Sequence, residues 1–277
     1  MESKRSTYII AAISLLVIIT AIYFLFIFQK KPKEIETDVA SNEVKEVANL
    51  KTEERPYVTL TPTSDGVEIV ISVENMASFD KIEYELIYLA DNPQVPGQKL
   101  ERGATGTDVN TKDAKFKKSI LLGTASKKVR SPDQGITDGK LTMHMFKGET
   151  EYLSETKWDI MRVTGQTNSI HDSLGNITVS SLSLDKDYWV ITADTVGIPK
   201  DDKFKSAKLP VYGIFSIPPK FLQNAKLEIK SDEDAKIYAY NHNDGQIEEL
   251  ESTFNEKNKT ISAVISNFAT FVVVSSQ

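Results

Sequence analysis

The sequence predicts a mainly β protein with an N-terminal transmembrane helix, a charged stalk and two antiparallel β-sandwich domains. Three observations lead to this prediction. An apolar run fills residues 8–28, a polar and charged stretch follows over 29–55, and apolar residues alternate with polar ones at many places after Tyr57. Alternation with a period of two is typical of strands that bury one face. No cysteine occurs among the 277 residues, so disulfides and thiolate chemistry are excluded.

The apolar run, YIIAAISLLVIITAIYFLFIF, carries no charged residue. At ~1.5 Å per residue a helix of this length spans ~30 Å, which matches the hydrocarbon core of a bilayer. Because lipid offers no hydrogen-bonding partner to the backbone, a lone span must be helical. The residues assigned to the membrane anchor are Tyr8, Ile9, Ile10, Leu15, Leu16, Val17, Ile18, Ile19, Ile22, Tyr23, Phe24, Leu25, Phe26, Ile27 and Phe28.

The anchor is expected to stay on the mature protein. A cleaved signal has a shorter apolar core followed by small residues, whereas this run ends in phenylalanines and then lysines. The charges that set the topology are Lys4 and Arg5 on one side and Lys30, Lys31 and Lys33 on the other. The cation count favours a cytoplasmic C-terminus, but long domains translocate largely regardless of charge. We therefore expect a single-pass signal-anchor in the cell membrane, with residues 1–7 cytoplasmic and the C-terminal domains extracytoplasmic.

Residues 29–55 read as a charged linker or stalk. They contain no aromatic residue and few aliphatic ones, so they cannot bury enough surface to fold alone, and a transient helix is expected over 42–50. Beyond residue 33 the chain holds 28 Lys and Arg against 38 Asp and Glu, a net charge of −10. An acidic surface offers no basic footprint for nucleic acid, so no nucleic-acid partner is expected.

Residues 56–164 are expected to form an immunoglobulin-like or fibronectin-III-like β-sandwich. Short alternating segments are separated by turn formers such as Ser64-Asp65-Gly66, and no helical pattern intervenes. The expected strands are 57–61, 67–73, 82–88, 116–122, 140–146 and 152–163. The Cys…Trp…Cys signature of antibody domains is missing, so the likeness is one of architecture.

A polar segment, residues 165–176, is assigned as the linker to a second β-sandwich over 177–277. Its expected strands are 177–184, 188–193, 209–217, 225–229, 237–240, 246–250, 260–266 and 268–274. The stretch Asn241-His242-Asn243-Asp244-Gly245 has the composition of a hairpin loop between two of these strands.

The closing strands resemble those of β-sandwich modules, including ZU5-like modules, at the ends of bacterial single-pass surface proteins. The match consists of a Tyr-x-Tyr hairpin and a Thr-Ile-x-Ala-x-Ile, x-Phe-x-x-Phe pair. It is carried by Tyr238, Tyr240, Gly245, Leu250, Ile261, Ala263, Ile265, Phe268 and Phe271. Some ZU5-like modules cleave themselves at His-Phe-Ser. Here the corresponding residues are Asn267-Phe268-Ala269, which supply neither the hydroxyl nucleophile nor the base.

The first predicted domain, with the segments IEYELIYLA and SILLGTASKKVR, resembles an uncharacterised family of single-pass surface proteins of ultrasmall bacteria. Some members of that family carry a cysteine pair where this chain has Ala125 and Arg130. The resemblance implies a β-rich surface domain and implies no activity.

No known catalytic motif is recognisable in this sequence. The histidines His144, His171 and His242 share no metal-ligand spacing, and neither a G-x-S-x-G elbow nor a G-x-G-x-x-G or Walker A loop is present. The expectation is that the protein is not an enzyme and carries no cofactor.

Two kinds of ligand remain open from the sequence. Structural Ca²⁺ could bind carboxylate clusters, although solvated turns explain these clusters as well. The clusters are Asp185-x-Asp187, Asp201-Asp202, Asp232-Glu233-Asp234 and Asn241-x-Asn243-Asp244. A glycan could stack on exposed aromatic rings, for which the candidates are Tyr152, Trp158, Tyr188, Trp189, Tyr238 and Tyr240, although such rings are more often core.

The function expected from the sequence is display of β-sandwich modules at the cell surface for adhesion or envelope assembly by protein–protein contact. The alternative is a surface module that binds glycan or peptidoglycan. The expected partners are therefore the lipid bilayer, through one helix, and a protein or glycan at the cell surface.

Overall fold

The structure, a computed structural model, describes residues 44–46, 50, 52–127, 129–180, 187–217 and 221–275. The chain divides into two units, Met1–Ser41 and Asn42–Gln277, and the second is described below. None of the helices in these ranges is long and apolar enough to cross a membrane. The cytoplasmic tail, the transmembrane helix 8–28 and the topology-setting charges remain predictions, because they lie outside the described residues.

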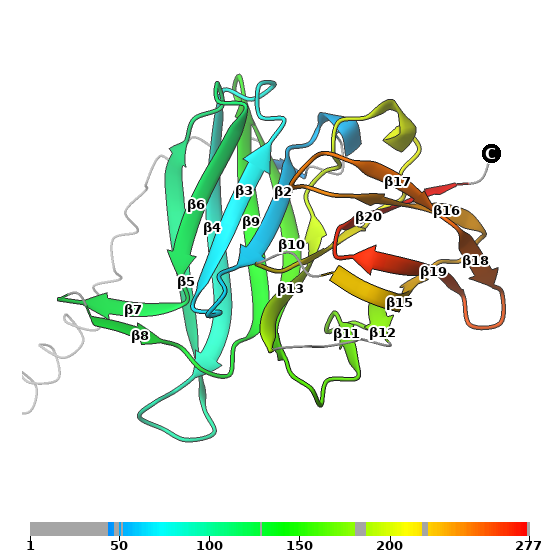
Figure 1. The fold of residues 1–277 in the computed structure, drawn as a ribbon. Coiled ribbons are helices and arrows are strands. Elements are labelled where there is room, and N and C mark those ends of the chain that lie inside the picture. Colours follow the sequence, from blue (N-terminus) through cyan, green and yellow to red (C-terminus); the bar gives the residue numbers. More distant parts are fainter. Residues whose placement is uncertain are drawn as a thin grey trace, which may run out of the picture. The chain divides into compact units, whose positions relative to one another are not determined.

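The largest sheet runs in the order β17–β16–β20–β14–β13–β10–β9–β4–β5, with all neighbours antiparallel (Figure 1). β1 (Val44–Glu46) joins it through parallel pairing with β10. The other strands are β4 (Lys81–Asp91), β5 (Lys99–Val109), β9 (Thr137–Lys147), β10 (Thr150–Val163), β13 (Tyr188–Thr195), β14 (Val211–Phe215), β16 (Ala235–Tyr240), β17 (Ile247–Leu250) and β20 (Thr270–Ser275).

Three smaller sheets accompany it. The first has the order β2–β3–β6, from β2 (Tyr57–Pro62), β3 (Glu68–Glu74) and β6 (Lys115–Leu121). The second has the order β11–β12–β15–β19–β18, from β11 (Ser169–His171), β12 (Ile177–Ser180), β15 (Phe221–Lys230), β18 (Ser252–Asn255) and β19 (Thr260–Asn267). The third is a two-stranded ribbon of β7 (Gly123–Ser126) and β8 (Val129–Pro132). Short 3-10 turns occur at Thr52–Glu54 and Asp202–Phe204.

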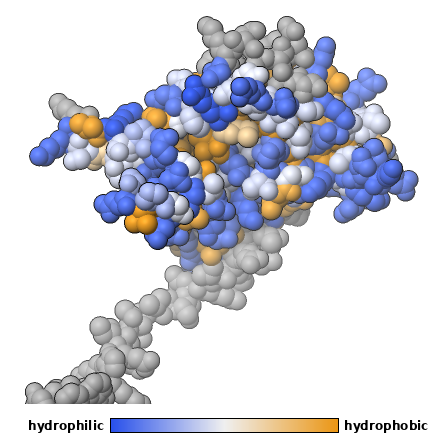
Figure 2. Space-filling model, turned by 90° about the horizontal axis from the view of Figure 1, so that it is seen from below, coloured by the Kyte–Doolittle hydropathy of each residue, from blue (hydrophilic) through white to orange (hydrophobic). Residues whose placement is uncertain are grey.

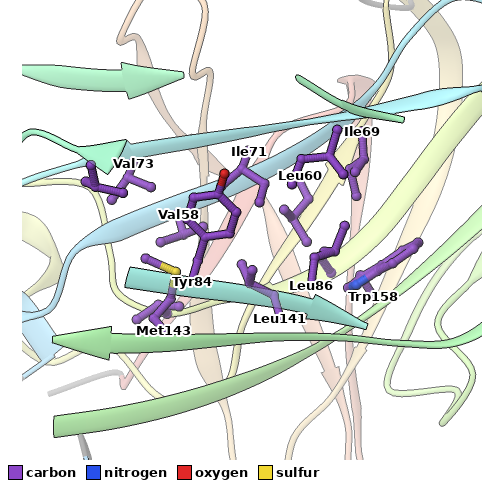
Figure 3. Close-up of a cluster of buried hydrophobic side chains, with 14 of the residues drawn as sticks. Val58, Leu60, Ile69, Ile71, Val73, Tyr84, Leu86, Leu141, Met143 and Trp158 are labelled. Atoms are coloured by element: carbon purple, nitrogen blue, oxygen red, sulfur yellow. The ribbon is translucent and has the colours of Figure 1, made fainter. Parts of the chain in front are cut away.

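The first core lies between β2–β3–β6 and the strands β4, β9 and β10 (Figure 3). The alternating direction of side chains along a strand explains why β4 contributes to this core: every second side chain of β4 is buried and the intervening ones are partly exposed. The residues facing one another in Figure 3 include Val58, Leu60, Ile69, Ile71, Val73, Tyr84, Leu86, Leu141, Met143 and Trp158. Full burial of one large aliphatic side chain contributes roughly 1.5–3 kcal/mol.

The second core lies on the opposite face of the large sheet, at β13. Tyr188 and Val190 contribute to the core that packs against β11–β12–β15–β19–β18, whereas Ile191 and Ala193 contribute to the first core. Successive side chains of a strand point to opposite faces, so β13 is covered on both sides. This double cover explains why β13 and β14 are buried almost throughout.

A buried hydrogen bond also joins the early and late parts of the chain. The hydroxyl groups of Tyr57 in β2 and Thr270 in β20 lie 2.5 Å apart, across 213 residues of sequence. Tyr57 further makes an edge-on contact with Tyr240, with 5.6 Å between the ring centroids. β2 is therefore anchored to the late strands as well as to β3.

The prediction of a mainly β fold with antiparallel sheets is confirmed for the described residues. The helix expected over 42–50 is wrong for Val44–Glu46, which form β1 because the free edge of β10 supplies the hydrogen bonds that an isolated stalk would lack. The boundaries of the two predicted sandwich domains and of the linker 165–176 stay predictions. Strands from both sides of that segment, β10 and β13, pair directly.

Candidate functional site

The three histidines lie in unrelated surroundings. His144 Nδ1 lies 2.7 Å from Glu151 Oε1 on the neighbouring strand, and His171 Nδ1 lies 3.0 Å from the carbonyl oxygen of Asp172. His242, in the β16–β17 loop, packs edge-on against Phe215 at 5.1 Å between ring centroids. Burial lowers the pKa of His242 to about 4, and nearby lysines add to this effect. None of these contacts, within the described ranges, joins a histidine to both a hydroxyl and a carboxylate.

The carboxylate clusters considered for Ca²⁺ mostly serve as turn and ion-pair partners. The Asp201 side chain accepts the backbone N–H of Lys203 at 2.9 Å, and the side chain of Asn241 donates to Asp244 at 2.9 Å. Over the part of the chain that is described, no group of three or more His, Cys, Asp or Glu residues is placed to hold a metal ion. Asp185 lies outside that part.

Of the aromatic residues considered for sugar stacking, Trp158 and Tyr188 are buried and the other four are partly exposed. Trp158 is 1% exposed, and its ring lies so close to Gly139 that a Cβ there would come within 2.4 Å of the indole. The indole of Trp189 covers Gly66 in the same way, at 2.2 Å. The large hydrophobic residues that are exposed in the described ranges are all aliphatic. A cavity of about 570 Å³ beside Trp158 therefore offers no free indole face.

A different feature distinguishes the C-terminal half, namely an open seam between two sheets. β17 is the last strand of the large sheet and pairs on one side with β16. β18 pairs with β19 up to Ala263 and leaves the rest of β19 uncovered on that side. Between these two strand edges lies a groove of about 270 Å³, which we call the seam groove. Its lining residues are Ala239, Asn241, Gln246, Ile247, Glu248, Leu250, Ile265, Ser266, Asn267 and Ala269.

The backbone at the seam groove is directed toward an additional strand. Asn241 N–H donates to the Gln246 carbonyl, so Asn241 and Gln246 are a hydrogen-bonded pair. Because such pairs alternate along an antiparallel ladder, the peptide groups of Glu248 and Leu250 also point toward β16. The peptide groups of Ile247 and Glu249 then point away from β16. An edge of this kind is a template for pairing with another strand.

The one charged residue that lines the seam groove, Glu248, is negative, and the segment around it is acidic. Residues 243–256 contain Asp244, Glu248, Glu249, Glu251 and Glu256 and no lysine or arginine. Glu249 pairs with Lys236 at 2.6 Å, whereas Glu248 and Glu251 are exposed and enter no ion pair among the described residues. A charge at the core-facing side of an edge strand opposes indiscriminate pairing and favours a cationic partner.

A positively charged segment forms the β7–β8 ribbon, which we call the arm. Its hairpin projects from the body of the second unit in Figure 1 and stands out at the left of Figure 2. All described residues of 124–132 are exposed, and Val129 reaches 69% exposure. The arm carries Lys127, Lys128 and Arg130 and no acidic residue. Arg130 pairs with Glu68 at the base of β3, at 2.7 Å.

One further carboxyl group is perturbed, mainly by burial. Asp194 in β13 is half-buried, and burial raises its pKa to about 6, with a further contribution from the charges of Asp172 and Asp159 and an opposing one from Lys157. Asp172 is engaged elsewhere, since its carboxylate accepts the backbone N–H groups of Asn176 and Ile177.

Comparisons with protein-family models, with curated proteins and with solved structures find no match to this chain. The resemblance to surface proteins expected from the closing strands therefore stays a prediction. The membrane-anchor residues, Tyr8 to Phe28, lie outside the described residues.

The sequence reasoning named neither the seam groove nor the arm as sites. The run without a basic residue over 243–256 and the run without an acidic residue over 123–132 were the signals that could have indicated them. Charge runs of this kind are usually solvated surface, and only the strand order shows that they fall on a free edge and on a projecting ribbon.

Proposed function

We propose that this protein is a single-pass, signal-anchored cell-surface protein that displays its β-sheet domains for adhesion or envelope assembly through protein–protein contact. The observation that carries this proposal is the seam groove, where a free strand edge meets an uncovered half-strand. Addition of an extended segment to such an edge is a recurrent mode of protein recognition.

The surface supports a protein ligand better than a sugar. Sugar sites need an exposed ring, and each of the rings considered for this role is buried or only partly exposed. The exposed face in Figure 2 is largely hydrophilic, with small separate apolar groups. Such a face suits binding through backbone pairing and charges better than binding through one large hydrophobic patch.

Display at the surface is part of the same proposal. The uncharged run over residues 8–28 and the charged stretch that follows support an anchor and a stalk. The acidic surface keeps the exposed domains soluble.

Photo-cross-linking in cells tests the contact. The photoreactive residue p-benzoyl-phenylalanine replaces Glu248 in the seam groove, and a control chain carries it at Lys112, an exposed residue in the β5–β6 loop. The expected result is a protein adduct from position 248 and none from position 112. In parallel, the purified full chain is sedimented with isolated peptidoglycan and is expected to stay in the supernatant.

The rival function, glycan or peptidoglycan binding, predicts the reverse pattern. Co-sedimentation with peptidoglycan, together with no protein adduct at position 248, would overturn the proposal in favour of the rival.

A further inference from the structure

The arm is a strand pair with nothing beside it. β7 and β8 pair with each other and with no further strand in the described residues. An isolated two-stranded ribbon is marginally stable in water, and both of its outer edges present free peptide groups. The edge of β7 is the better donor, because β8 ends in Pro132, which has no N–H.

The side chains of β7 suit a narrow site. The strand reads Gly-Thr-Ala-Ser, and small side chains can enter the space over Leu250 and Ile265 at the seam groove. β7 and β17 each contain four residues, so the two ladders match in length. Backbone pairing would supply the affinity, and the side chains would supply the fit.

The charges are complementary. The arm contributes three cations with no acid, and the segment 243–256 contributes five acids with no cation. Lys127 is exposed at the turn of the arm and forms no ion pair among the described residues, as is the case for Glu248 at the seam groove and for Glu251, which follows β17. Complementary charges increase the rate of encounter and reject like-charged edges.

The arm and the seam groove lie on opposite sides of the second unit in Figure 1. The arm therefore cannot reach the seam groove of its own copy. A contact that uses one surface on the first copy and a different surface on the second is head-to-tail, and such contacts continue into rings or filaments.

We propose that the occupant of the seam groove is the arm of a second copy of this chain, added as a strand to β17, so that copies assemble head to tail. This inference rests on the proposed function and names its partner. Lys127 would face Glu248 of the receiving copy.

The test uses the full chain in mild detergent and measures mass by sedimentation velocity at several concentrations. An arm variant, K127E/K128E, and a groove variant, E248K/E251K, each reverse two charges. The control variant K112E/K147E reverses two exposed lysines elsewhere. Circular dichroism and the melting temperature establish that each variant is folded.

The expected result is a concentration-dependent series of oligomers for the wild type and the control, and monomers for the arm variant and the groove variant alone. A mixture of those two variants should restore the series, because each arm then meets a groove of opposite charge on the other variant. The four-fold variant K127E/K128E/E248K/E251K should recover the series. Oligomers of the wild type should shorten as salt rises from about 0.05 to 0.5 M.

A wild-type chain that stays monomeric, a series that persists in either reversal variant, or a mixture of the two variants that stays monomeric would overturn the inference. If the wild type is monomeric while position 248 still cross-links to a different protein in cells, self-assembly fails and the proposed function stands. If neither occurs, both fail.

Discussion

At the scale of single residues, Asp194 and His242 give the fold opposite responses to acid. The pKa of Asp194 is raised to about 6, so the folded state binds a proton more readily than the unfolded state between about pH 4 and pH 6. The ionised carboxylate therefore destabilises the fold as pH rises through 6. The pKa of His242 is lowered to about 4, so its contribution to stability is complete above about pH 6.5 and is lost as pH falls toward 4.

Replacement of Asp194 by asparagine should consequently stabilise the protein at neutral pH. We expect the free energy of unfolding at pH 7 to rise by about 1–3 kcal/mol, because a half-buried charge is removed, and to change little at pH 4, where the native carboxyl is protonated. Urea unfolding at the two pH values measures the difference. In D194N the loss of stability on acidification should also steepen, since the opposing His242 effect is no longer offset.

The control for this prediction is D202N, at an exposed aspartate in the short 3-10 turn, which should change stability by less than about 0.5 kcal/mol. Equal destabilisation of D194N at both pH values would show that Asp194 is held by contacts to its carboxylate rather than penalised by burial.

At the scale of elements, the register of the arm can be checked by a cross-link. Ala125 lies directly opposite Arg130 in the β7–β8 pair, and directly opposed Cα atoms in an antiparallel ladder are about 4.5–5.5 Å apart. This separation falls in the range of a disulfide, and the native chain has no cysteine to compete. The positions coincide with the cysteine pair that the resemblance to surface proteins implied.

The variant A125C/R130C should therefore close an intramolecular disulfide under mild oxidation. Mass spectrometry should show the loss of two hydrogens and no reaction with an alkylating reagent until reduction. The variant A125C/S131C, which shifts one partner by a residue, is the matched control and should close more slowly. Faster closure in the control would place the arm in a different register.

The sequence predicted most strands because their alternation survives in the structure, as in β4 and β9. It missed β5, whose glycines and exposed polar residues resemble a loop, and it missed the short strands β7, β8, β11 and β18. Periodicity reports which face is buried but not which strand ends a sheet. For this reason the seam groove, which exists because β17 ends one sheet and β18 stops short on the other, could not be predicted from composition.

At the scale of the whole second unit, the two cores share one sheet. β13 contributes Val190 to one core and Ile191 to the other, and the Tyr57–Thr270 hydrogen bond adds a further link. Elements that share a strand on both faces cannot lose one core without exposing the other. We infer that the described part of the chain unfolds as one cooperative unit.

A destabilising substitution in the second core should therefore also shift the unfolding transition of the first core. Phe271→Ala removes a fully buried ring and should lower stability by about 3–5 kcal/mol. With Trp189 replaced by phenylalanine in both chains, the fluorescence of Trp158 in the first core should shift to lower urea together with far-ultraviolet circular dichroism. Two separated transitions, with the Trp158 signal unmoved, would show that the halves unfold independently.

Cysteine labelling on intact cells measures whether the seam groove lies outside the cell and whether it is occupied. The full chain carries one cysteine, from Glu248→Cys in the groove or from Lys112→Cys as the exposed control, and intact cells are treated with a membrane-impermeant maleimide. We expect rapid labelling at position 112, slow labelling at position 248, and rapid labelling at position 248 once K127E/K128E is added. Labelling of both positions only after lysis would contradict surface display, and equally rapid labelling of both in the otherwise native chain would contradict an occupied groove.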